Sequence, residues 1–169
     1  VTSRELFEYR EKLNLGHEKD FLTVGGMGHA NQIAIGIALQ KPNRRVVCLD
    51  GDGAALMHMG SMAINGNIDC KNFKHIIFNN GAHDSVGGQP TVGFSINLQN
   101  IAKASGYDIV LKAETNEEII SCLKKLKIFD GKVFLEIKIK KGFRDNLARP
   151  KTTPKENKIH LMKFIKKTT

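Results

Sequence analysis

The strongest constraint on the fold is the stretch 46–80, in which two apolar runs flank a helical segment. The first run ends in Asp-Gly-Asp-Gly at 50–53, and the second ends in Asn-Asn-Gly at 79–81. Two strands joined in this way form a right-handed βαβ crossover, in which both strands end at the same edge of the sheet. We therefore expect Asp52 and Asn80 to meet at the edge where open α/β sheets bind ligands.

The residue types at this edge predict a particular ligand. One carboxylate, one amide oxygen and a nearby backbone carbonyl form a sparse set of hard oxygens, which suits Mg²⁺ that also binds a phosphorylated partner. The Gly-Asp-Gly turn allows close approach of the backbone, and the amides of Gly53, Ala54 and Ala55 open the following helix, where an anion is favoured. A divalent metal with a diphosphate is the expected occupant. A lone Gly-Asp-Gly is more often an ordinary turn, so the Asn pair is needed for this interpretation.

The pattern Gly51-Asp52-Gly53, twenty-five intervening residues and Asn79-Asn80 resembles the motif of thiamine-diphosphate-dependent 2-keto acid decarboxylases. The resemblance implies that Asp52, Asn80 and the backbone carbonyl of Ala82 bind Mg²⁺. It also implies that residues 53–55 and Asn80 contact the diphosphate. Many members have Ser after this turn, whereas this chain has Ala54, so a hydroxyl contact to the diphosphate would be missing.

The longer string 79–90, Asn-Asn-Gly-Ala-His-Asp-Ser-Val-Gly-Gly-Gln-Pro, is similar to that of phosphonopyruvate decarboxylase, with sulfopyruvate decarboxylase as the nearest relative. This implies the diphosphate-binding, C-terminal domain of an enzyme of phosphonate biosynthesis that converts 3-phosphonopyruvate to phosphonoacetaldehyde and CO₂. In such enzymes a Glu on a separate pyrimidine-binding domain or subunit activates the cofactor. Glu136 does not match that residue, so we expect the chain alone to be inactive and the enzyme to be an oligomer.

A second glycine-rich stretch, Gly25-Gly26-Met27-Gly28, follows the first helix. Taken alone, it fits a phosphate loop and a tight turn equally well. The resemblance implies that Gly25, Gly26 and Met27 bind the cofactor. In it, the Met27 side chain holds the cofactor in a bent conformation, and the Gly25 carbonyl accepts a hydrogen bond from the pyrimidine. The alternative is that Met27 is one more core methionine.

His83 and Asp84 follow the proposed metal turn directly and are the candidates for catalysis. An imidazole beside a diphosphate can donate a hydrogen bond or a proton, so His83 is also a candidate for contacting the cofactor. The alternative is a solvated loop. The stretch 87–91 could order over a substrate or remain a surface loop.

Helices and strands alternate along the chain, which predicts a three-layer, doubly wound α/β fold with a mainly parallel sheet and helices on both faces. We expect a cofactor-binding domain over 1–141 and a basic C-terminal extension over 142–169. Further elements are expected as helices at 3–15, 30–40, 98–105, 116–126 and 157–165, and as strands at 21–24, 108–111 and 133–139. Apolar and charged residues alternate toward the end of the last strand, so we expect this strand at an edge of the sheet or half-exposed.

The net charge of +9 is concentrated in the tail, where residues 141–169 hold nine Lys/Arg and two Asp/Glu. A basic nucleotide- or nucleic-acid-binding module is the alternative from another class, and salt-sensitive binding to oligonucleotides would favour it. With no Trp and two Tyr, however, a stacking platform for single strands is poorly supported, so no nucleic-acid partner is expected. Arg144 or Arg149 could instead bind the substrate anion.

The remaining composition predicts an ordinary intracellular domain. No apolar run approaches the length of a membrane span, and the first residues lack the apolar core of a signal peptide, so we expect a cytoplasmic protein without a membrane partner. The three cysteines have no metal-ligand spacing, and Cys48 is expected to be a small buried apolar residue.

Overall fold

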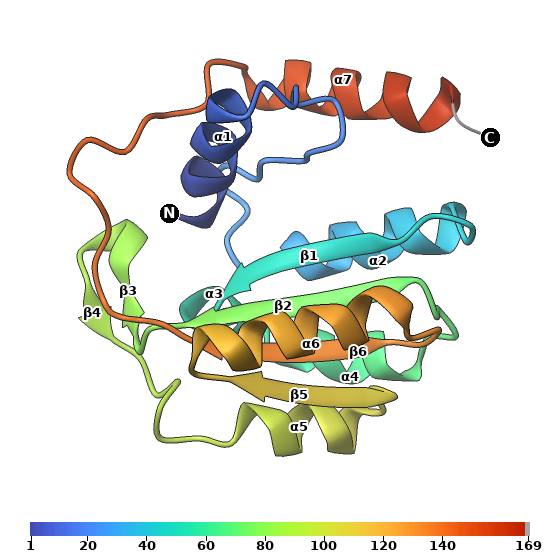
Figure 1. Ribbon diagram of the computed structural model, residues 1–169, viewed down its shortest axis with the longest axis vertical. Helices are drawn as coiled ribbons and strands as arrows, with labels where there is room; N and C mark the ends of the chain where they lie inside the picture. Colours follow the sequence, from blue (N-terminus) through green and yellow to red (C-terminus); the bar gives the residue numbers. More distant parts are fainter. Residues whose placement is uncertain (168–169) are drawn as a thin grey trace. The chain divides into compact units, whose positions relative to one another are not determined.

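The computed structural model describes residues 1–167 and is built around one four-stranded sheet (Figure 1). Its strand order is β1-β2-β6-β5, and every neighbouring pair is parallel. The strands are β1 (Val46–Gly51), β2 (Phe73–Asn79), β5 (Ile109–Ala113) and β6 (Val133–Lys138). A short antiparallel hairpin of β3 (Ala82–His83) and β4 (Gln89–Pro90) follows β2, with the 3₁₀ turn η1 (Asp84–Val86) between its strands.

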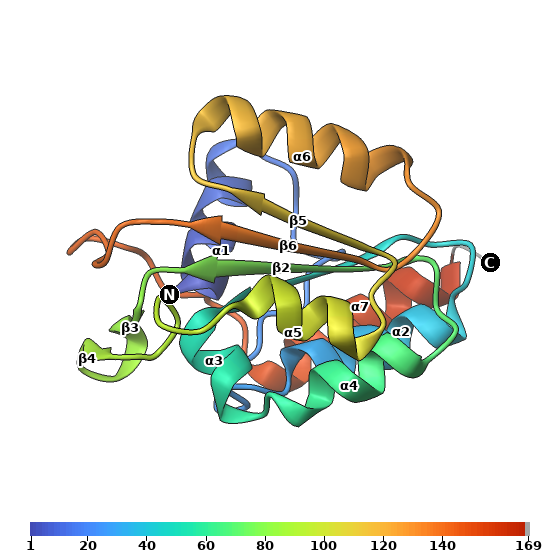
Figure 2. The same cartoon turned by 90° about the horizontal axis from the view of Figure 1, so that it is seen from below.

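Helices cover both faces of the sheet (Figure 2), which confirms the predicted α/β architecture. On one face lie α2 (Ala30–Gln40), α3 (Asp52–Met57), α4 (Gly60–Asn67) and α5 (Leu98–Ser105). On the other lies α6 (Asn116–Ile128). Two apolar clusters correspond to the two faces, because alternate residues of a strand point to opposite sides. The clusters include Ile35, Ala38, Cys48, Met62, Phe73 and Phe134 toward α2 to α5, and Ile76, Cys122, Leu126, Val133 and Leu135 toward α6.

Local sequence signals set the ends of several helices. Thr115 accepts a hydrogen bond from the Glu118 amide and the Glu118 side chain bonds back to the Thr115 amide, which is the capping box that begins α6. Asn97 caps α5, and Gly106, with φ of 97°, ends it. The helix predicted at 98–105 is therefore confirmed.

Two sequence predictions about the elements are wrong, and a third is refined. Residues 21–24 form no strand, because the Leu22 amide donates to the Asn157 side chain at 2.8 Å instead of to a neighbouring strand. The strand β6 lies between β2 and β5 and is buried along most of its length, so it is no edge strand. The helical segment after β1 is interrupted at His58, whose φ of −134° and ψ of 45° lie outside the helical region.

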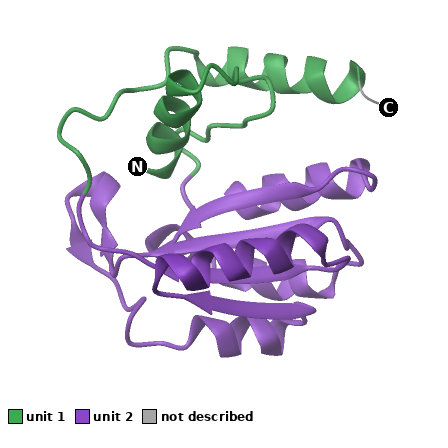
Figure 3. Ribbon diagram, viewed as in Figure 1, with its two compact units in different colours: residues 1–26, 143–169 green, residues 27–142 purple. Residues whose placement is uncertain are grey.

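The chain divides into two compact units, which Figure 3 colours separately. Residues 27–142 contain the sheet, and residues 1–26 with 143–167 contain α1 (Thr2–Lys12) and α7 (Pro154–Lys167). Within the unit that contains α1 and α7, the Asn157 side chain also donates to the Asp20 carbonyl at 3.2 Å. The predicted domain division at 141/142 stays a prediction. No helix among residues 1–167 is long and apolar enough to cross a membrane.

Candidate functional site

The carboxyl ends of β1 and β2 bring together the two polar motifs of the sequence. Asp52 begins α3 directly after β1, and its side chain is 1% exposed. Its Oδ1 accepts a hydrogen bond from the Asn80 amide at 3.3 Å, and its Oδ2 accepts one from the Thr91 hydroxyl. The parallel pairing of β1 with β2 explains this contact, because it aligns the residues that follow each strand.

The side chain of Asn80 shapes the turn after β2. Its Oδ1 accepts a hydrogen bond from the Ala82 amide at 3.1 Å, and its Nδ2 donates to Asp84 Oδ2 at 2.6 Å. The same Asp84 oxygen accepts a hydrogen bond from the Gly142 amide at 2.7 Å. Asp84 therefore connects the side-chain amide of Asn80 to the backbone at Gly142. Asn80 and Asp84 are both half-buried at the sheet edge.

The buried charge of Asp52 has no cationic partner among residues 1–167, since the ion pairs found there do not include it. Its two partners are a backbone amide and a hydroxyl, which are neutral. A buried carboxylate is costly without a positive charge nearby. The oxygens of Asp52 and Asn80 are ligands of the kind that Mg²⁺ takes, so the residues fit a divalent cation.

His83 lies directly against the first turn of α3. A Cβ atom added to Gly53 would come within 2.3 Å of His83 Nδ1 and 2.6 Å of its Cε1, so only glycine allows this contact. Gly53, Ala54 and Ala55 are buried in the same turn. The sequence predicted Gly53 for a close approach of the backbone to a ligand, and it gave no signal for the contact with His83.

The glycine-rich stretch 25–28 spans the boundary between the units. Gly28, with φ of 87°, packs on α3, because an added Cβ would meet the Ala54 carbonyl at 3.0 Å. Met27 is half-buried and begins the unit that contains the sheet. Gly25 and Gly26 belong to the other unit, so their part in cofactor binding stays a prediction.

Two residues at the site were missed in the sequence. Thr91 donates a hydrogen bond from its hydroxyl to Asp52, whereas the sequence suggested a stretch that either orders over a substrate or remains a surface loop. Gly93 lies so close that an added Cβ would be 2.6 Å from Asp52 Oδ2 and 2.7 Å from Asn79 Oδ1. The only sequence signal for Thr91 and Gly93 is that they follow the Asn pair. Their contacts with Asp52 depend on the path of the loop back toward β1, which the sequence does not reveal.

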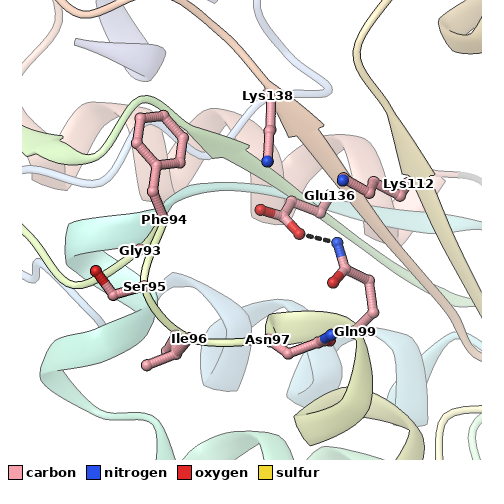
Figure 4. Close-up of a pocket in the computed structure, with 9 residues that line it drawn as sticks. All are labelled: Gly93, Phe94, Ser95, Ile96, Asn97, Gln99, Lys112, Glu136 and Lys138. Atoms are coloured by element: carbon pink, nitrogen blue, oxygen red, sulfur yellow. Dashed lines mark hydrogen bonds between the residues drawn. The ribbon is translucent and has the colours of Figure 1, made fainter.

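A polar cavity of about 280 Å³ lies beside this edge, at the ends of β5 and β6 (Figure 4). Lys112 and Lys138 both line it, and both pair with Glu114, at 2.5 and 3.3 Å. The two lysines lower the pKa of the Glu114 carboxyl. The other lining residues are Gly93, Phe94, Ser95, Ile96, Asn97, Gln99 and Glu136.

A second polar cluster is buried in the sheet, on the neighbouring strands β1 and β2. His75 Nε2 is 3.5 Å from Asp50 Oδ2, and His75 Nδ1 is 3.1 Å from the Tyr107 hydroxyl. Cys48 pairs in register with His75, and all three donor atoms of Cys48, Asp50 and His75 lie within 4.8 Å of one another. Burial, and then the Asp50 charge, raises the pKa of the Cys48 thiol well above its usual value. Cys48 is 3% exposed, so the expectation that it is buried is confirmed.

Of the two arginines considered for the substrate anion, Arg144 has other partners. Arg144 donates to Glu5 at 2.8 Å and to Glu8 at 2.7 Å, all within the unit that contains α1. Arg149 is exposed. Two carboxylates of this unit therefore already engage the guanidinium of Arg144.

A family model and individual relatives both match most of the chain. Residues 8–137 match the family model described as "Thiamine pyrophosphate enzyme, C-terminal TPP binding domain". The chain is 37% identical over 164 residues to a phosphonopyruvate decarboxylase of Streptomyces viridochromogenes, covering 97% of this chain and 40% of that protein. It is 32% identical over 167 residues to the sulfopyruvate decarboxylase subunit beta of Methanococcus maripaludis, covering 99% and 86%. The chain thus spans about two fifths of the phosphonopyruvate decarboxylases it matches.

Solved structures agree on the fold. A thiamin diphosphate-dependent enzyme from Mycobacterium smegmatis superposes with a TM-score of 0.60 at 23% identity, covering 70% of this chain and 23% of that one. A thiamine diphosphate-dependent 4-hydroxybenzoylformate decarboxylase from Rhodococcus jostii gives 0.59 at 21% identity, covering 70% and 24%. At these identities the likeness concerns the fold alone.

Proposed function

Because the chain belongs to the family of C-terminal, TPP-binding domains of thiamine pyrophosphate enzymes, we propose that it is the diphosphate- and Mg²⁺-binding half of a phosphonopyruvate decarboxylase. The observation that carries this proposal is the contact of the buried Asp52 carboxylate with the Asn80 amide. The relatives at 37% identity support the phosphonate substrate.

Each candidate residue has a defined task in this proposal. Asp52, Asn80 and the Ala82 carbonyl would hold Mg²⁺, and the amides of residues 53–55 would hold the diphosphate. The bound cofactor supplies an electron sink that makes loss of CO₂ from a 2-keto acid possible. Gly25, Gly26 and Met27 would orient the organic part of the cofactor.

His83 and Asp84 would have different tasks, His83 as a donor of a hydrogen bond or proton and Asp84 as a residue that orients a metal ligand. The His83 ring lies against Gly53, so it borders the turn proposed for the diphosphate and can donate a hydrogen bond or a proton there. Asp84 bonds to the Asn80 side chain and so would set the orientation of a metal ligand.

The proposal includes a pyrimidine-binding domain or subunit that supplies the activating Glu. The match to most of a sulfopyruvate decarboxylase subunit beta supports a subunit arrangement and makes sulfopyruvate the second candidate substrate. A cytoplasmic homo-oligomer of the assembled enzyme is part of the same proposal.

The decisive experiment assays the chain assembled with its pyrimidine-binding part, in the presence of Mg²⁺ and thiamine diphosphate. Phosphonopyruvate, sulfopyruvate and pyruvate are compared as substrates, and release of CO₂ is measured. We expect the highest kcat/KM with phosphonopyruvate and no turnover by the isolated chain. If only sulfopyruvate is turned over, sulfopyruvate replaces phosphonopyruvate as the proposed substrate. If thiamine diphosphate does not bind in a Mg²⁺-dependent way, the proposal as a whole is contradicted.

A further inference from the structure

Glu136 is a buried acidic residue on the interior strand β6 that the proposed function does not use. It is 3% exposed, and none of the ion pairs found among residues 1–167 includes it. Its Oε1 accepts a hydrogen bond from Asn79 Nδ2 at 2.6 Å, and its Oε2 accepts one from Gln99 Nε2, which Figure 4 shows as a dashed line. Both donors are neutral amides, so the carboxylate is held by directed hydrogen bonds.

Asn79 connects Glu136 to two loops. Its side chain is fully buried; Nδ2 also donates to the Gly93 carbonyl at 2.7 Å, and Oδ1 accepts from the Gly81 amide at 3.1 Å. The side-chain amide of Asn79 therefore hydrogen-bonds both to the turn after β2 and to the segment around Gly93. These two loops supply the groups that contact Asp52, namely the Asn80 amide and the Thr91 hydroxyl.

The chemistry of Glu136 sets the direction of the Asn79 amide. An amide group can be rotated by half a turn with little change in shape, which would exchange its donor and acceptor ends. An ionised carboxylate only accepts hydrogen bonds, so it fixes the NH₂ end toward β6 and leaves the oxygen for the Gly81 amide. The reversed amide would face the Glu136 carboxylate and the Gly93 carbonyl with its own oxygen.

We propose that Glu136 is a positioning residue for the metal site and acts through Asn79 to hold both loops around Asp52. This inference rests on the proposed function, because the geometry that it maintains is the one proposed to bind Mg²⁺ and diphosphate. The residue reaches the site by a chain of hydrogen bonds, Glu136 to Asn79 and Asn79 to Gly81 and Gly93. Glu136 touches neither the metal nor the cofactor in this account.

Three substitutions of Glu136 test whether its hydrogen-bond acceptor or its negative charge is what matters for Asn79. Glu136→Met keeps a similar volume and removes the acceptor, and Glu136→Asp shortens the side chain and withdraws the acceptor from Asn79. Glu136→Gln keeps an acceptor for Asn79, because its NH₂ end can face Gln99, whose half-buried amide can rotate to offer its oxygen. Lys103→Met is the control, since Lys103 is an exposed residue of α5, the helix that also carries Gln99.

The test uses the assembled enzyme and calorimetric titration of thiamine diphosphate at fixed Mg²⁺, together with steady-state kinetics. We expect Glu136→Met and Glu136→Asp to weaken Mg²⁺-dependent cofactor binding on the order of 10- to 100-fold, the effect of an unsatisfied buried donor. Glu136→Gln should stay within about threefold of wild type, and Lys103→Met should bind the cofactor as wild type does. At saturating cofactor, kcat should be close to wild type in all soluble variants.

The outcomes distinguish this inference from the proposed function. Wild-type affinity in Glu136→Met, or in Glu136→Asp if the Met variant does not fold, would overturn the role of Glu136 while the wild-type titration still supports the cofactor site. Equal losses in the Gln and Met variants would also overturn it, because the charge and not the acceptor would then matter. Absence of Mg²⁺-dependent binding in the wild-type enzyme would remove the proposed function and this inference together.

Discussion

The Asp52 carboxylate and the Asn80 backbone amide lie 3.3 Å apart, although the residues are 28 positions apart in the sequence. The contact exists because two parallel strands end side by side. It turns two loop residues into one site and leaves a buried negative charge at its centre. That charge leads to the first prediction.

Asp52→Ala should weaken Mg²⁺-dependent binding of thiamine diphosphate by more than the roughly 10- to 100-fold typical of outer-shell changes, because it removes a proposed metal ligand. Without Mg²⁺, its thermal stability should be equal to or above that of wild type, since a buried charge is removed. Calorimetric titration and thermal unfolding measure the two effects. The exposed Asp69→Ala is the control, and unchanged cofactor affinity in Asp52→Ala would remove this residue from the site.

Thr91→Val should weaken the same binding by about 10-fold or more, because its hydroxyl orients the Asp52 carboxylate. The valine has a similar shape but cannot donate a hydrogen bond. Thr91→Ser keeps the hydroxyl and should bind the cofactor nearly as wild type does. Similar affinities in the Val and Ser variants would show that the hydroxyl does not position Asp52.

Gly53→Ala should displace His83, because the new Cβ would lie 2.3 Å from the ring nitrogen. We expect kcat of the assembled enzyme to fall by about 10-fold or more, within the range contributed by a positioned acid or base. Gly60→Ala is the matched control, since a Cβ there meets nothing within 4 Å. A Gly53→Ala enzyme with wild-type kcat and its usual pH profile would argue against a role for His83.

Thr115→Ala should lower the free energy of unfolding by about 1 kcal/mol, because it removes the cap of α6. Thr115→Ser keeps the capping oxygen and should be near wild type. Urea unfolding followed by circular dichroism measures both variants. Cofactor affinity should be unchanged, and a loss of affinity without a loss of stability would contradict a purely capping role.

The buried thiols predict a pH dependence of stability. Burial raises the pKa of Cys48, and also those of Cys70 and Cys122, above the ordinary value of 9.0. A group whose folded pKa is raised contributes stability below its unfolded pKa, and that stability is lost as the pH rises through and above it. The free energy of unfolding should therefore fall as the pH rises through about 9, when measured in urea under reducing conditions. Cys48→Ala should reduce this slope most, and an unchanged slope would contradict the prediction.

The parallel α/β fold and the Asp52 to Asn80 contact could be predicted from the sequence, because both follow from apolar runs and from the parallel crossover. The order of the strands in the sheet was not predicted. The burial of β6 could not, since Glu136 interrupts the apolar pattern and looks like a solvent-facing residue. Its partners Asn79 and Gln99 come from distant segments, and only the folded structure shows that they satisfy it. The coil at 21–24 was missed for a related reason, because a side chain of α7 takes the place of a neighbouring strand.

The order of strands in the sheet has a consequence for biosynthesis. The strand β6 is the last to leave the ribosome, yet it lies in the middle, between β2 and β5. Until residues 133–138 emerge, β5 has no partner in this sheet and β2 is paired on one side only. Such non-local pairings close slowly, so the edges of β2 and β5 stay open to pairing with other chains until β6 is inserted.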